Sequence, residues 1–505
     1  MKFFIRTDAS RWIGSGHVMR CLVLADGLKS AGHQVTFICR PQDGDLLDLI
    51  TARNHNLLAL SSLTTAIRPE HGADYSSWLQ VPWQQDAADV LASVVYADWL
   101  IVDHYGINAQ WEREIRLSLN CKLLAIDDLV RPHDADFILD QTLDRTPEVY
   151  FECFNISEKQ PVVLSGVAYA LLSSQFEKIR NQGILRAPIS RQPRVLLSFG
   201  GIDEPNVTLR VLMALSEFNA VFTVLLSPRA PHYQAVKTWC DEHVNVVHHD
   251  FIQDMAILMS EHDLAIGAPG TTTWERACLG LPNIVIPIAA NQQAICQALL
   301  AHQAALLVQQ SDIESRLIPA LHDLLNNYKK YVDNNLELCD GKGVQRVINT
   351  IMANTEISGF RLRPVSIDDT LLIYQWQSDP VTRRYALNPN PPSWVEHKSW
   401  MEKKIQRQQD YFFLIINAEN SEPYGAVRLD ELDTDNYLIS IFVAPNKHGQ
   451  GIGLTGLKLL DRCLPRIRIH ATVLTENIAS QRLFSNAGYQ QVAPDKFIRE
   501  PLWTK

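Results

Sequence analysis

Short runs of apolar and β-branched residues alternate with amphipathic stretches over roughly the first two thirds of the chain. The stretch that follows the first run has an apolar residue at every third or fourth position, as an amphipathic helix does. These positions are Val18, Cys21, Leu22, Ala25 and Leu28. Strands that alternate with such helices form βαβ units and a parallel sheet. The expected buried strands are Lys2–Ile5, Val35–Cys39, Trp99–Val102, Lys122–Ile126, Arg194–Phe199, Phe222–Leu226, Leu264–Ile266 and Asn283–Ile286.

The pattern changes twice along the chain. Turn-rich stretches within residues 155–192 separate two groups of α/β elements, which predicts two lobes. Beyond Phe360 the apolar runs have the spacing of hairpin-connected strands, which predicts a separate α+β module. These runs are Arg361–Pro364, Phe412–Ile416, Gly425–Leu429 and Tyr437–Val443. We therefore expect an α/β protein with a first lobe at 1–160, a second lobe at 161–338, a linker at 339–359 and the α+β module at 360–505.

Composition narrows the range of partners. The chain has 505 residues, too many for one hydrophobic core. Acidic residues outnumber basic ones by 56 to 46 without any basic run, so neither nucleic acid nor a membrane surface is an expected partner. No apolar stretch reaches about 18 residues, and the N-terminal one is too short for a signal peptide. The nine cysteines form no C-x-x-C pair, which favours a cytoplasmic location and no zinc site.

The strongest local signal follows the first strand. Arg6-Thr7-Asp8 leads into the turn and helix start Gly14-Ser15-Gly16-His17-Val18-Met19-Arg20. Glycines let a ligand approach the backbone, and free N–H groups at a helix start favour an anion. A neutral imidazole at His17 would take a proton from water, and the helix N-terminus disfavours its cationic form. A purely structural histidine is the alternative interpretation.

Two further glycine turns follow predicted strands of the second lobe. One is Gly200-Gly201, with Asn206 as a candidate N-cap of the next helix. The other spans residues 267–275, where Glu275 is either a capping-box partner of Thr272 or an acceptor for ribose hydroxyls. Ligands of open α/β sheets bind beyond the carboxyl ends of the strands. Three such turns therefore predict a nucleotide-sugar site in the cleft between the lobes.

Acidic residues and histidines occupy other strand ends. Asp103-His104-Tyr105 and Asp127-Asp128 each follow a predicted strand, and we expect them to orient loops or hydroxyls at the same cleft. A third ligand for a divalent cation is not evident, so no metal is expected. His248-His249 lies in a predicted connecting segment and is expected to be plain surface.

Six motifs together resemble one enzyme family. They are Gly14–Leu22, Val102–Tyr105, Ile126–Leu129, Ser198–Gly201, Trp274–Arg276 and Asn291-Gln292. The family is the UDP-2,4-diacetamido-2,4,6-trideoxy-β-L-altropyranose hydrolases of pseudaminic acid biosynthesis, and the resemblance covers roughly residues 1–335. It implies a GT-B-like fold of two Rossmann-like lobes. It also implies that uridine is held mainly by the second lobe, that the sugar lies between the lobes and that no metal takes part.

The resemblance implies roles for individual residues. His17 would be the general base that activates the water attacking C1, with inversion and departure of UDP. Glu275 would bind ribose, and Gly270 and Thr271 would line the diphosphate pocket. The other substrate contacts would be Gly16, Tyr105 and Asn291. Pro269 departs from the family pattern, in which a small flexible residue is common.

The C-terminal module has a glycine turn of its own. The predicted strand Tyr437–Val443 leads into Ala444-Pro445-Asn446-Lys447-His448-Gly449-Gln450-Gly451-Ile452-Gly453 and a leucine-rich helix. Backbone N–H groups around such glycines can cradle a pyrophosphate, although an ordinary αβ connection has the same pattern. With Asn477–Phe484 and Ala487-Gly488-Tyr489 further on, residues 360–500 resemble the GNAT N-acetyltransferases.

That resemblance implies acetyl-CoA as co-substrate, with its pyrophosphate on the turn and its pantetheine arm along the strand. Phe484 stands where many relatives carry the tyrosine that protonates the leaving thiolate, and Glu431 is only a guess for the base. His448 stands where arginine or glutamine is usual. The implied cofactor contacts are Ile441, Phe442, Val443, His448, Gly449, Gln450, Gly451, Gly453 and Asn477.

Fusion of the two modules predicts a bifunctional enzyme. The C-terminal module would acetylate the 4-amine of a UDP-linked amino-trideoxy sugar, and the N-terminal part would then remove UDP. Two alternatives stay open. One is a GT-B glycosyltransferase with a fused acyltransferase, and the other is a nucleotide-sugar-binding regulatory chain whose acetyltransferase-like tail is inactive.

Overall fold

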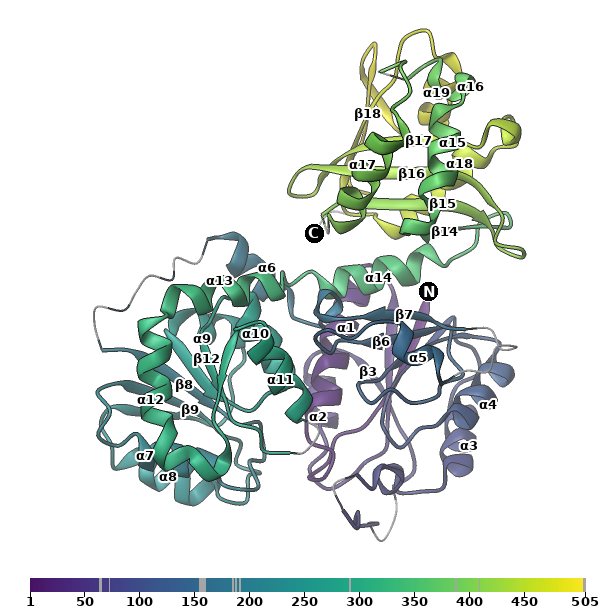
Figure 1. Ribbon diagram of the computed structural model, residues 1–505. Coiled ribbons are helices and arrows are strands. Elements are labelled where there is room, and N and C mark those ends of the chain that lie inside the picture. Colours follow the sequence, from purple (N-terminus) through teal and green to yellow (C-terminus); the bar gives the residue numbers. More distant parts are fainter. Residues whose placement is uncertain are drawn as a thin grey trace. The chain divides into compact units, whose positions relative to one another are not determined.

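The computed structural model describes residues 1–62, 66–71, 73–153, 160–183, 186, 189, 192–289, 292–386, 388–407 and 409–502. The chain forms two compact units, Met1–Arg346 and Val347–Lys505 (Figure 1). The first unit contains two parallel sheets and the second contains one mixed sheet.

The first sheet has the order β3-β2-β1-β4-β5-β6-β7, and every neighbouring pair is parallel. Its strands are β1 (Lys2–Thr7), β2 (Gln34–Cys39), β3 (Asn56–Ala59), β4 (Trp99–Asp103), β5 (Lys122–Ile126), β6 (Phe137–Asp140) and β7 (Val162–Ser165). The helical segments between and after them are α1 (Gly16–Ser30), α2 (Leu47–Ala52), η1 (Tyr75–Leu79), α3 (Trp83–Ser93), α4 (Ala109–Leu119), α5 (Glu148–Phe151), η2 (Val167–Tyr169) and α6 (Ser174–Asn181).

The second sheet is also parallel, in the order β10-β9-β8-β11-β12-β13. Its strands are β8 (Arg194–Ser198), β9 (Val221–Leu225), β10 (Val246–His249), β11 (Leu264–Gly267), β12 (Asn283–Val285) and β13 (Ala305–Leu307). The helical segments of this lobe, and those that follow it, are α7 (Val207–Ala214), α8 (Tyr233–Asp241), α9 (Met255–Glu261), α10 (Thr271–Cys278), α11 (Gln293–Ala301), η4 (Gln310–Asp312), α12 (Ile313–Asn326), α13 (Tyr328–Leu338) and α14 (Gly343–Ala353).

The structure confirms the predicted fold class of two Rossmann-like lobes followed by an α+β domain. The periodicity of α1 is explained by its packing, because Val18, Cys21 and Leu22 are at most 1% exposed. Two boundaries differ from expectation. The first lobe was expected to end at residue 160, but β7 lies beyond that point and pairs with β6. Residues 339–359, expected as a linker, contain helix α14.

The prediction that His248-His249 is plain surface in a connecting segment was wrong. Both residues belong to β10, and the side chain of His248 is only 4% exposed. Burial lowers the pKa of His248 below its ordinary value. The segment was missed because it is an edge strand of four residues in which polar side chains interrupt the apolar pattern.

The second unit is built on a mixed sheet in the order β14-β15-β16-β17-β18-β20-β19. The strands are β14 (Phe360–Pro364), β15 (Tyr411–Asn417), β16 (Pro423–Asp433), β17 (Asn436–Val443), β18 (Arg468–Thr472), β19 (Gln490–Ala493) and β20 (Lys496–Arg499). The helical segments are η5 (Ile367–Asp369), α15 (Thr370–Ser378), α16 (Pro380–Arg383), α17 (Trp394–Gln406), η6 (Pro445–Lys447), α18 (Ile452–Cys463) and α19 (Ile478–Asn486).

Different helices cover the two faces of this sheet. Helix α18 packs so closely on one face that a Cβ atom on Gly456 would lie 2.4 Å from the side chain of Ile415. On the other face, Trp376 of α15 contacts Phe442 of β17, and Trp400 of α17 contacts Phe412 of β15.

Strands β17 and β18 separate within the sheet. They pair in parallel only from Asn436 to Leu438 on one strand and from Arg468 to His470 on the other. Beyond this point β17 continues to Val443 beside β16, whereas β18 continues beside β20. The far half of β17 therefore has a sheet neighbour on one side only among the described residues.

Candidate functional site

His17 stands in the first turn of α1, next to the carboxyl end of β4. Its Nδ1 atom lies 2.6 Å from Oδ1 of Asp103, the last residue of β4, whose side chain is fully buried. A carboxylate can only accept a hydrogen bond, so Nδ1 carries a proton, and in the neutral imidazole Nε2 then presents a lone pair. The pair thus has the geometry of a general base held in one tautomer by a buried carboxylate.

Arg20, one helical turn after His17, holds Asp103 in its ionised form. Its Nε and Nη2 atoms donate to the two carboxylate oxygens, each at 2.7 Å. Burial by itself would raise the pKa of Asp103, but the charge of Arg20 and the interaction with His17 outweigh it and hold that pKa well below its usual range. The carboxylate is therefore a permanent negative charge behind the imidazole.

Tyr105 joins this cluster from the segment after β4. Its hydroxyl donates to Oδ2 of Asp128 at 3.0 Å, and Arg20 Nη1 donates to the same oxygen. The Tyr105 ring meets the His17 imidazole edge to face at 4.6 Å between centroids. The structure therefore brings together Gly16, His17, Tyr105 and Asp128, three of which are predicted substrate or catalytic residues.

Two aromatic residues of this cluster were missed from the sequence. Trp78 stacks on Tyr105 at 5.6 Å and lies 5.9 Å from His17, and Tyr75 contacts both Trp78 and Tyr105. Both come from η1, a single short turn without a period long enough to recognise. The signal available in the sequence was a tryptophan within a polar, turn-rich stretch. In the structure the side chain of Trp78 is only 7% exposed.

The segment Arg6-Thr7-Asp8 supports the site through buried ion pairs. The side chains of Arg6 and Asp8 are fully buried, and Arg6 pairs with Asp8 at 2.6 Å and with Asp86 at 2.8 Å. Asp8 also lies 3.3 Å from Nε2 of His104, while Nδ1 of His104 accepts from the Gly106 amide at 3.0 Å. These contacts fix the end of β4, which carries Asp103, and the turn after it, which carries Tyr105, so the motif is structural.

The turn before α1 leaves room for a ligand. Gly14 has a φ of +80°, and a side chain at Gly14 or Gly16 would meet no atom within 4 Å. The first amide of α1 bonded within the helix is that of Met19, so those of Gly16, His17 and Val18 have no intrahelical acceptor. A Cβ atom on Gly201 would lie 3.9 Å from Oγ of Ser15, which places the second lobe's glycine turn opposite this one.

The second-lobe turn differs from the prediction in its capping residue. Asn206 has a φ of +58°, and its side chain makes no cap hydrogen bond with α7. Instead the carboxylate of Asp203 accepts from the amides of Val207 at 3.0 Å and Thr208 at 2.8 Å. The N-terminus of α7 is thus already satisfied by a protein carboxylate.

The third turn leaves Glu275 without a capping role. Helix α10 begins at Thr271, and the amide of Gly270 donates to Oγ1 of Thr273 at 3.0 Å. Oε2 of Glu275 is buried without a hydrogen-bond partner among the described residues, and burial raises the pKa of this carboxyl to about 7. A side chain at Gly270 would meet no atom within 4 Å, so space is open beside Thr271. Asn291 lies outside the described residues.

The glycine turn of the C-terminal unit has the shape of an anion cradle. Gly449 and Gly451 have φ of +78° and +76°, and a side chain on either would meet no atom within 4 Å. The first amide of α18 bonded within the helix is that of Thr455, so those of Ile452, Gly453 and Leu454 have no intrahelical acceptor. Gln450 lies between the two glycines in the same turn. The residues present therefore fit a pyrophosphate.

Among the described residues, the far half of β17 has backbone groups on the side away from β16 that pair with no other strand. The backbone amide of Ala444 donates to the carbonyl oxygen of Tyr424 on β16. Backbone groups alternate in direction along a strand, so those of Phe442 point to β16, whereas those of Ile441 and Val443 point to the open edge. His448 Nε2 lies 3.1 Å from the carbonyl oxygen of Val443. Ile441 and the Val443 amide are thus available to pair with an extended ligand.

Three other predicted positions have structural contacts. Asn477 caps α19 by accepting from the Ser480 amide at 3.1 Å. Phe484 is 4% exposed and packs against Tyr489 and Phe497. Glu431 of β16 pairs in register with Tyr437 of β17, and its backbone amide donates to Asp410.

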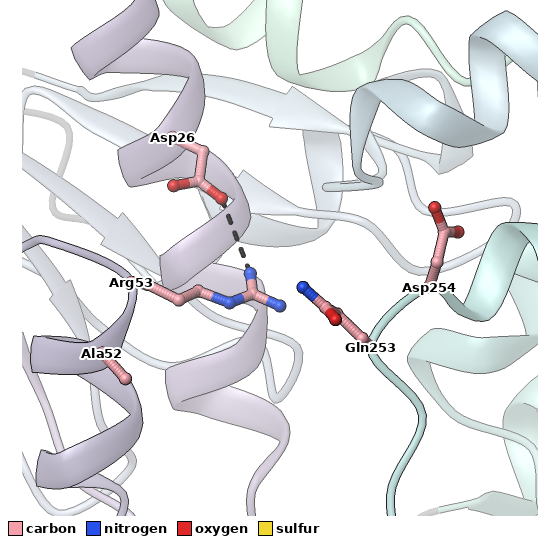
Figure 2. A pocket seen from close by; sticks show the side chains of 5 residues that line it. All are labelled: Asp26, Ala52, Arg53, Gln253 and Asp254. Atoms are coloured by element: carbon pink, nitrogen blue, oxygen red, sulfur yellow. Dashed lines mark ion pairs between the residues drawn. The ribbon is translucent and has the colours of Figure 1, made fainter.

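A separate polar cavity of about 500 Å³ lies elsewhere in the first unit (Figure 2). Arg53 and Asp26, which form an ion pair at 3.5 Å, line it together with Ala52, Gln253 and Asp254. Among the described residues, none of the predicted site residues lines this cavity. Within the ranges that the structure describes, no three His, Cys, Asp or Glu side chains cluster as metal ligands. No helix in those ranges has the length and apolar character needed to cross a bilayer.

Two family models match the chain. Residues 209–351 match the glycosyltransferase family 28 C-terminal domain, and residues 360–490 match the acetyltransferase (GNAT) domain. Together with the two parallel sheets, these matches define a GT-B-like N-terminal part followed by a GNAT domain.

Relatives extend the match to both parts of the chain. The UDP-2,4-diacetamido-2,4,6-trideoxy-beta-L-altropyranose hydrolase of Campylobacter jejuni is 26% identical over 59% of this chain and 92% of its own length. An uncharacterized protein of Methanocaldococcus jannaschii is 26% identical over all of this chain and 99% of its own. The solved structure of Acinetobacter baumannii MurG covers 68% of this chain and 97% of its own, with 18% identity and a TM-score of 0.46. The chain thus joins a homologue of a UDP-sugar hydrolase to a GNAT domain.

The buried carboxyl of Glu275 predicts a pH-dependent stability. Its pKa is about 7 in the folded protein against an ordinary 4.5, so the folded state binds this proton more tightly than the unfolded chain does. The free energy of unfolding should therefore fall as the pH rises from about 4.5 to about 7. Glu275→Gln removes this effect and should stabilise the first unit at pH 8 by up to about 3 kcal/mol, but not at pH 4. Denaturant unfolding at both pH values measures the difference.

The matched control is Glu242→Gln, which changes an exposed glutamate of the same unit. It should leave the pH dependence of unfolding unchanged. A Glu275→Gln variant with the wild-type pH dependence would contradict the assignment of a buried, unpartnered carboxyl.

Proposed function

We propose that the chain catalyses two consecutive reactions on a UDP-linked amino sugar. The first is acetyl-CoA-dependent N-acetylation of the 4-amine, and the second is hydrolysis of UDP-2,4-diacetamido-2,4,6-trideoxy-β-L-altropyranose to UDP and free sugar. The observation that carries the proposal is the His17–Asp103 pair beside an open turn, in a region homologous to that hydrolase and fused to a GNAT domain.

In the hydrolysis step, Nε2 of His17 takes a proton from water while the water oxygen attacks C1 of the sugar. The C1–O bond to UDP breaks, and the configuration at C1 inverts. The imidazolium that forms is stabilised by the Asp103 carboxylate, whose ionised state Arg20 maintains. The proposal assigns the sugar to Gly16, Tyr105 and Asn291, and the diphosphate to Gly270 and Thr271.

Glu275 is assigned to the ribose of UDP. A buried carboxylate oxygen without a partner is costly, and ribose hydroxyls would supply the missing donors. Because the structure assigns the capping of α10 to Thr273, the capping alternative for Glu275 has no contact to support it.

In the acetylation step, the amides of Gly449–Gly453 would hold the pyrophosphate of acetyl-CoA, and Ile441 and Val443 would pair with the pantetheine arm. His448 lies beside the same turn and can add a donor to the phosphates. Acetyl-CoA supplies the activated acetyl group when bound. Phe484 offers no proton for the leaving thiolate, so water would supply it.

The whole proposal is tested by product analysis on the full chain. Incubation with a UDP-linked 4-amino-trideoxy sugar and acetyl-CoA should yield CoA, UDP and free diacetamido sugar. Transfer of the sugar to an added acceptor, without release of free sugar, would instead identify a glycosyltransferase. Failure to consume acetyl-CoA with any UDP-amino sugar would favour a regulatory chain.

His17→Ala is expected to stop the sequence at the acetylated UDP-sugar, because the base is lost while the GNAT domain is untouched. Asp103→Asn should lower kcat for UDP release by roughly 100- to 10,000-fold, since the amide no longer fixes the tautomer of His17. UDP binding should change little in either variant. Release of UDP by coupled assay and binding by calorimetry measure the two quantities.

Asp26→Asn is the control for this pair, because Asp26 lies on the same helix but pairs with His55 and Arg53 rather than with His17. It should leave UDP release unchanged. Normal turnover in the His17→Ala variant would refute the base assignment.

Glu275→Gln is expected to weaken UDP binding by roughly 1.5–3 kcal/mol, the worth of a charge-assisted hydrogen bond. Calorimetric titration with UDP gives this value directly. Unchanged affinity, combined with the altered pH dependence of unfolding, would leave Glu275 with a structural role only.

Gly451→Leu is expected to raise the KM for acetyl-CoA by more than 10-fold, because the side chain would fill the open space at the start of α18. Gly488→Leu is the matched control, since Gly488 has a similar φ of +85° and also has open space around it. The control carries the same backbone strain in the same unit and should leave KM unchanged. An equal KM in both variants would contradict the pyrophosphate cradle.

A further inference from the structure

His470 lies where β17 and β18 separate. It is paired in register with Leu438, and these two residues form the last pair of the parallel ladder. After His470, β18 remains paired with β20 through Ala471 and Thr472. The imidazole is therefore carried by the last residue before the gap opens.

Strand alternation sets the face on which this imidazole lies. Ile469 and Ala471 are 0% and 3% exposed and point into the core, whereas His470 between them is only half-buried. Residues that pair in register share a face, so His470 lies on the same face as Leu438, and alternation adds Ser440 and Phe442 of β17. This is the face covered by α15 and α17, opposite to α18.

Most of the other charged groups on this face have partners. Asp430 pairs with Arg428 at 3.0 Å and with Lys404 of α17, and Arg468 pairs with Glu500 at 2.8 Å. Lys496 of β20, paired in register with Thr472, is a further cation on the same face. Among the described residues, no hydrogen bond or ion pair involves the imidazole of His470. It is thus an uncommitted proton acceptor.

A ligand that follows the open edge of β17 would end close to this histidine. Its anionic end would lie on the turn at Gly449–Gly453, and its arm would pass Val443 and then Ile441 toward Leu438. Neighbouring strands lie about 4.8 Å apart, so His470 is one strand spacing from the position where such an arm ends. Glu431 pairs with Tyr437 and therefore lies on the opposite face.

We propose that His470 is the general base of the acetyl transfer, a role that rests on the proposed function of the GNAT domain. His470 takes one proton from the ammonium group of the acceptor. The amine nitrogen then attacks the thioester carbonyl carbon, the C–N bond forms and the C–S bond breaks. The second nitrogen proton passes through water to the leaving thiolate, and His470 returns its proton to solvent. The products are the acetamide, CoA thiol and one proton.

His470→Gln in the full chain tests the role. With the UDP-linked 4-amino sugar, kcat should fall by roughly 100- to 10,000-fold at pH 7, while the KM for acetyl-CoA stays within about twofold. The deficit should shrink at higher pH, where the amine loses its proton unaided, and added imidazole should restore part of the rate in His470→Ala. His448→Gln is the comparison, because it should raise the KM for acetyl-CoA without changing the pH profile.

A loss that is equal at all pH values and is not restored by imidazole would overturn the proposal, as would an unchanged kcat. A melting temperature equal to that of the wild type excludes misfolding, and His470→Asn serves as a second variant. Wild-type chain that does not turn over this acceptor would instead contradict the proposed function.

A chemical-protection experiment distinguishes a failure of the His470 assignment from a failure of the proposed function. Diethyl pyrocarbonate modification of the wild-type chain, mapped by mass spectrometry, should be slowed at His470 by bound acetyl-CoA. The exposed His71 of the first unit should react at an unchanged rate. Protection of His71 and His470 alike, or of neither, would overturn the placement of His470 beside the acetyl group.

Discussion

A negative charge sealed in the interior, the carboxylate of Asp103, organises the N-terminal site. Removing such a charge from water is expensive unless it is paired, and Arg20 provides the pairing through two short hydrogen bonds. Because Arg20 and His17 belong to the same helix, this ion pair also fixes α1 against the end of β4. The orientation of the imidazole is thus a by-product of satisfying a buried charge.

A second buried network of charged side chains holds the Asp103 site in position. Asp8, Arg6 and Asp86 form ion pairs inside the lobe, and His104 connects Asp8 to the amide of Gly106. Asp103 ends the strand that leads into the turn between these partners, and Tyr105 lies in that turn. Residues that look like a ligand-binding motif in the sequence therefore act as the rigid base on which the site is built.

The sequence predicted most of the strands that are buried on both faces, because their apolar runs are continuous. In the lobe sheets it missed β3, β6, β7, β10 and β13, which are short and include both edge strands of each sheet, and in the mixed sheet it gave no range for β18, β19 or β20. It identified His17 and the glycine turns through local spacing. It did not identify Trp78, whose contact with His17 depends on tertiary packing.

Competition between nearby side chains explains the remaining differences. Asn206 and Asp203 both precede α7, and Asp203 takes the capping role. Thr273 likewise replaces Glu275 as the acceptor at the start of α10. The separation of β17 from β18 is not encoded in either strand alone, because it depends on which neighbour each strand keeps. That is why His470 has no signature in the sequence.

Phe484 has a consequence for how the C-terminal unit would respond to alkaline conditions. Its ring is packed against Tyr489 and Phe497, and burial raises the pKa of Tyr489 beyond the range in which phenols normally ionise. An acyltransferase that relies on a phenol as proton donor loses activity once that phenol ionises. If the C-terminal unit transfers acetyl groups as proposed, a phenyl ring at this position sets no such limit, and the upper end of the working pH range depends on the other titrating groups of the site.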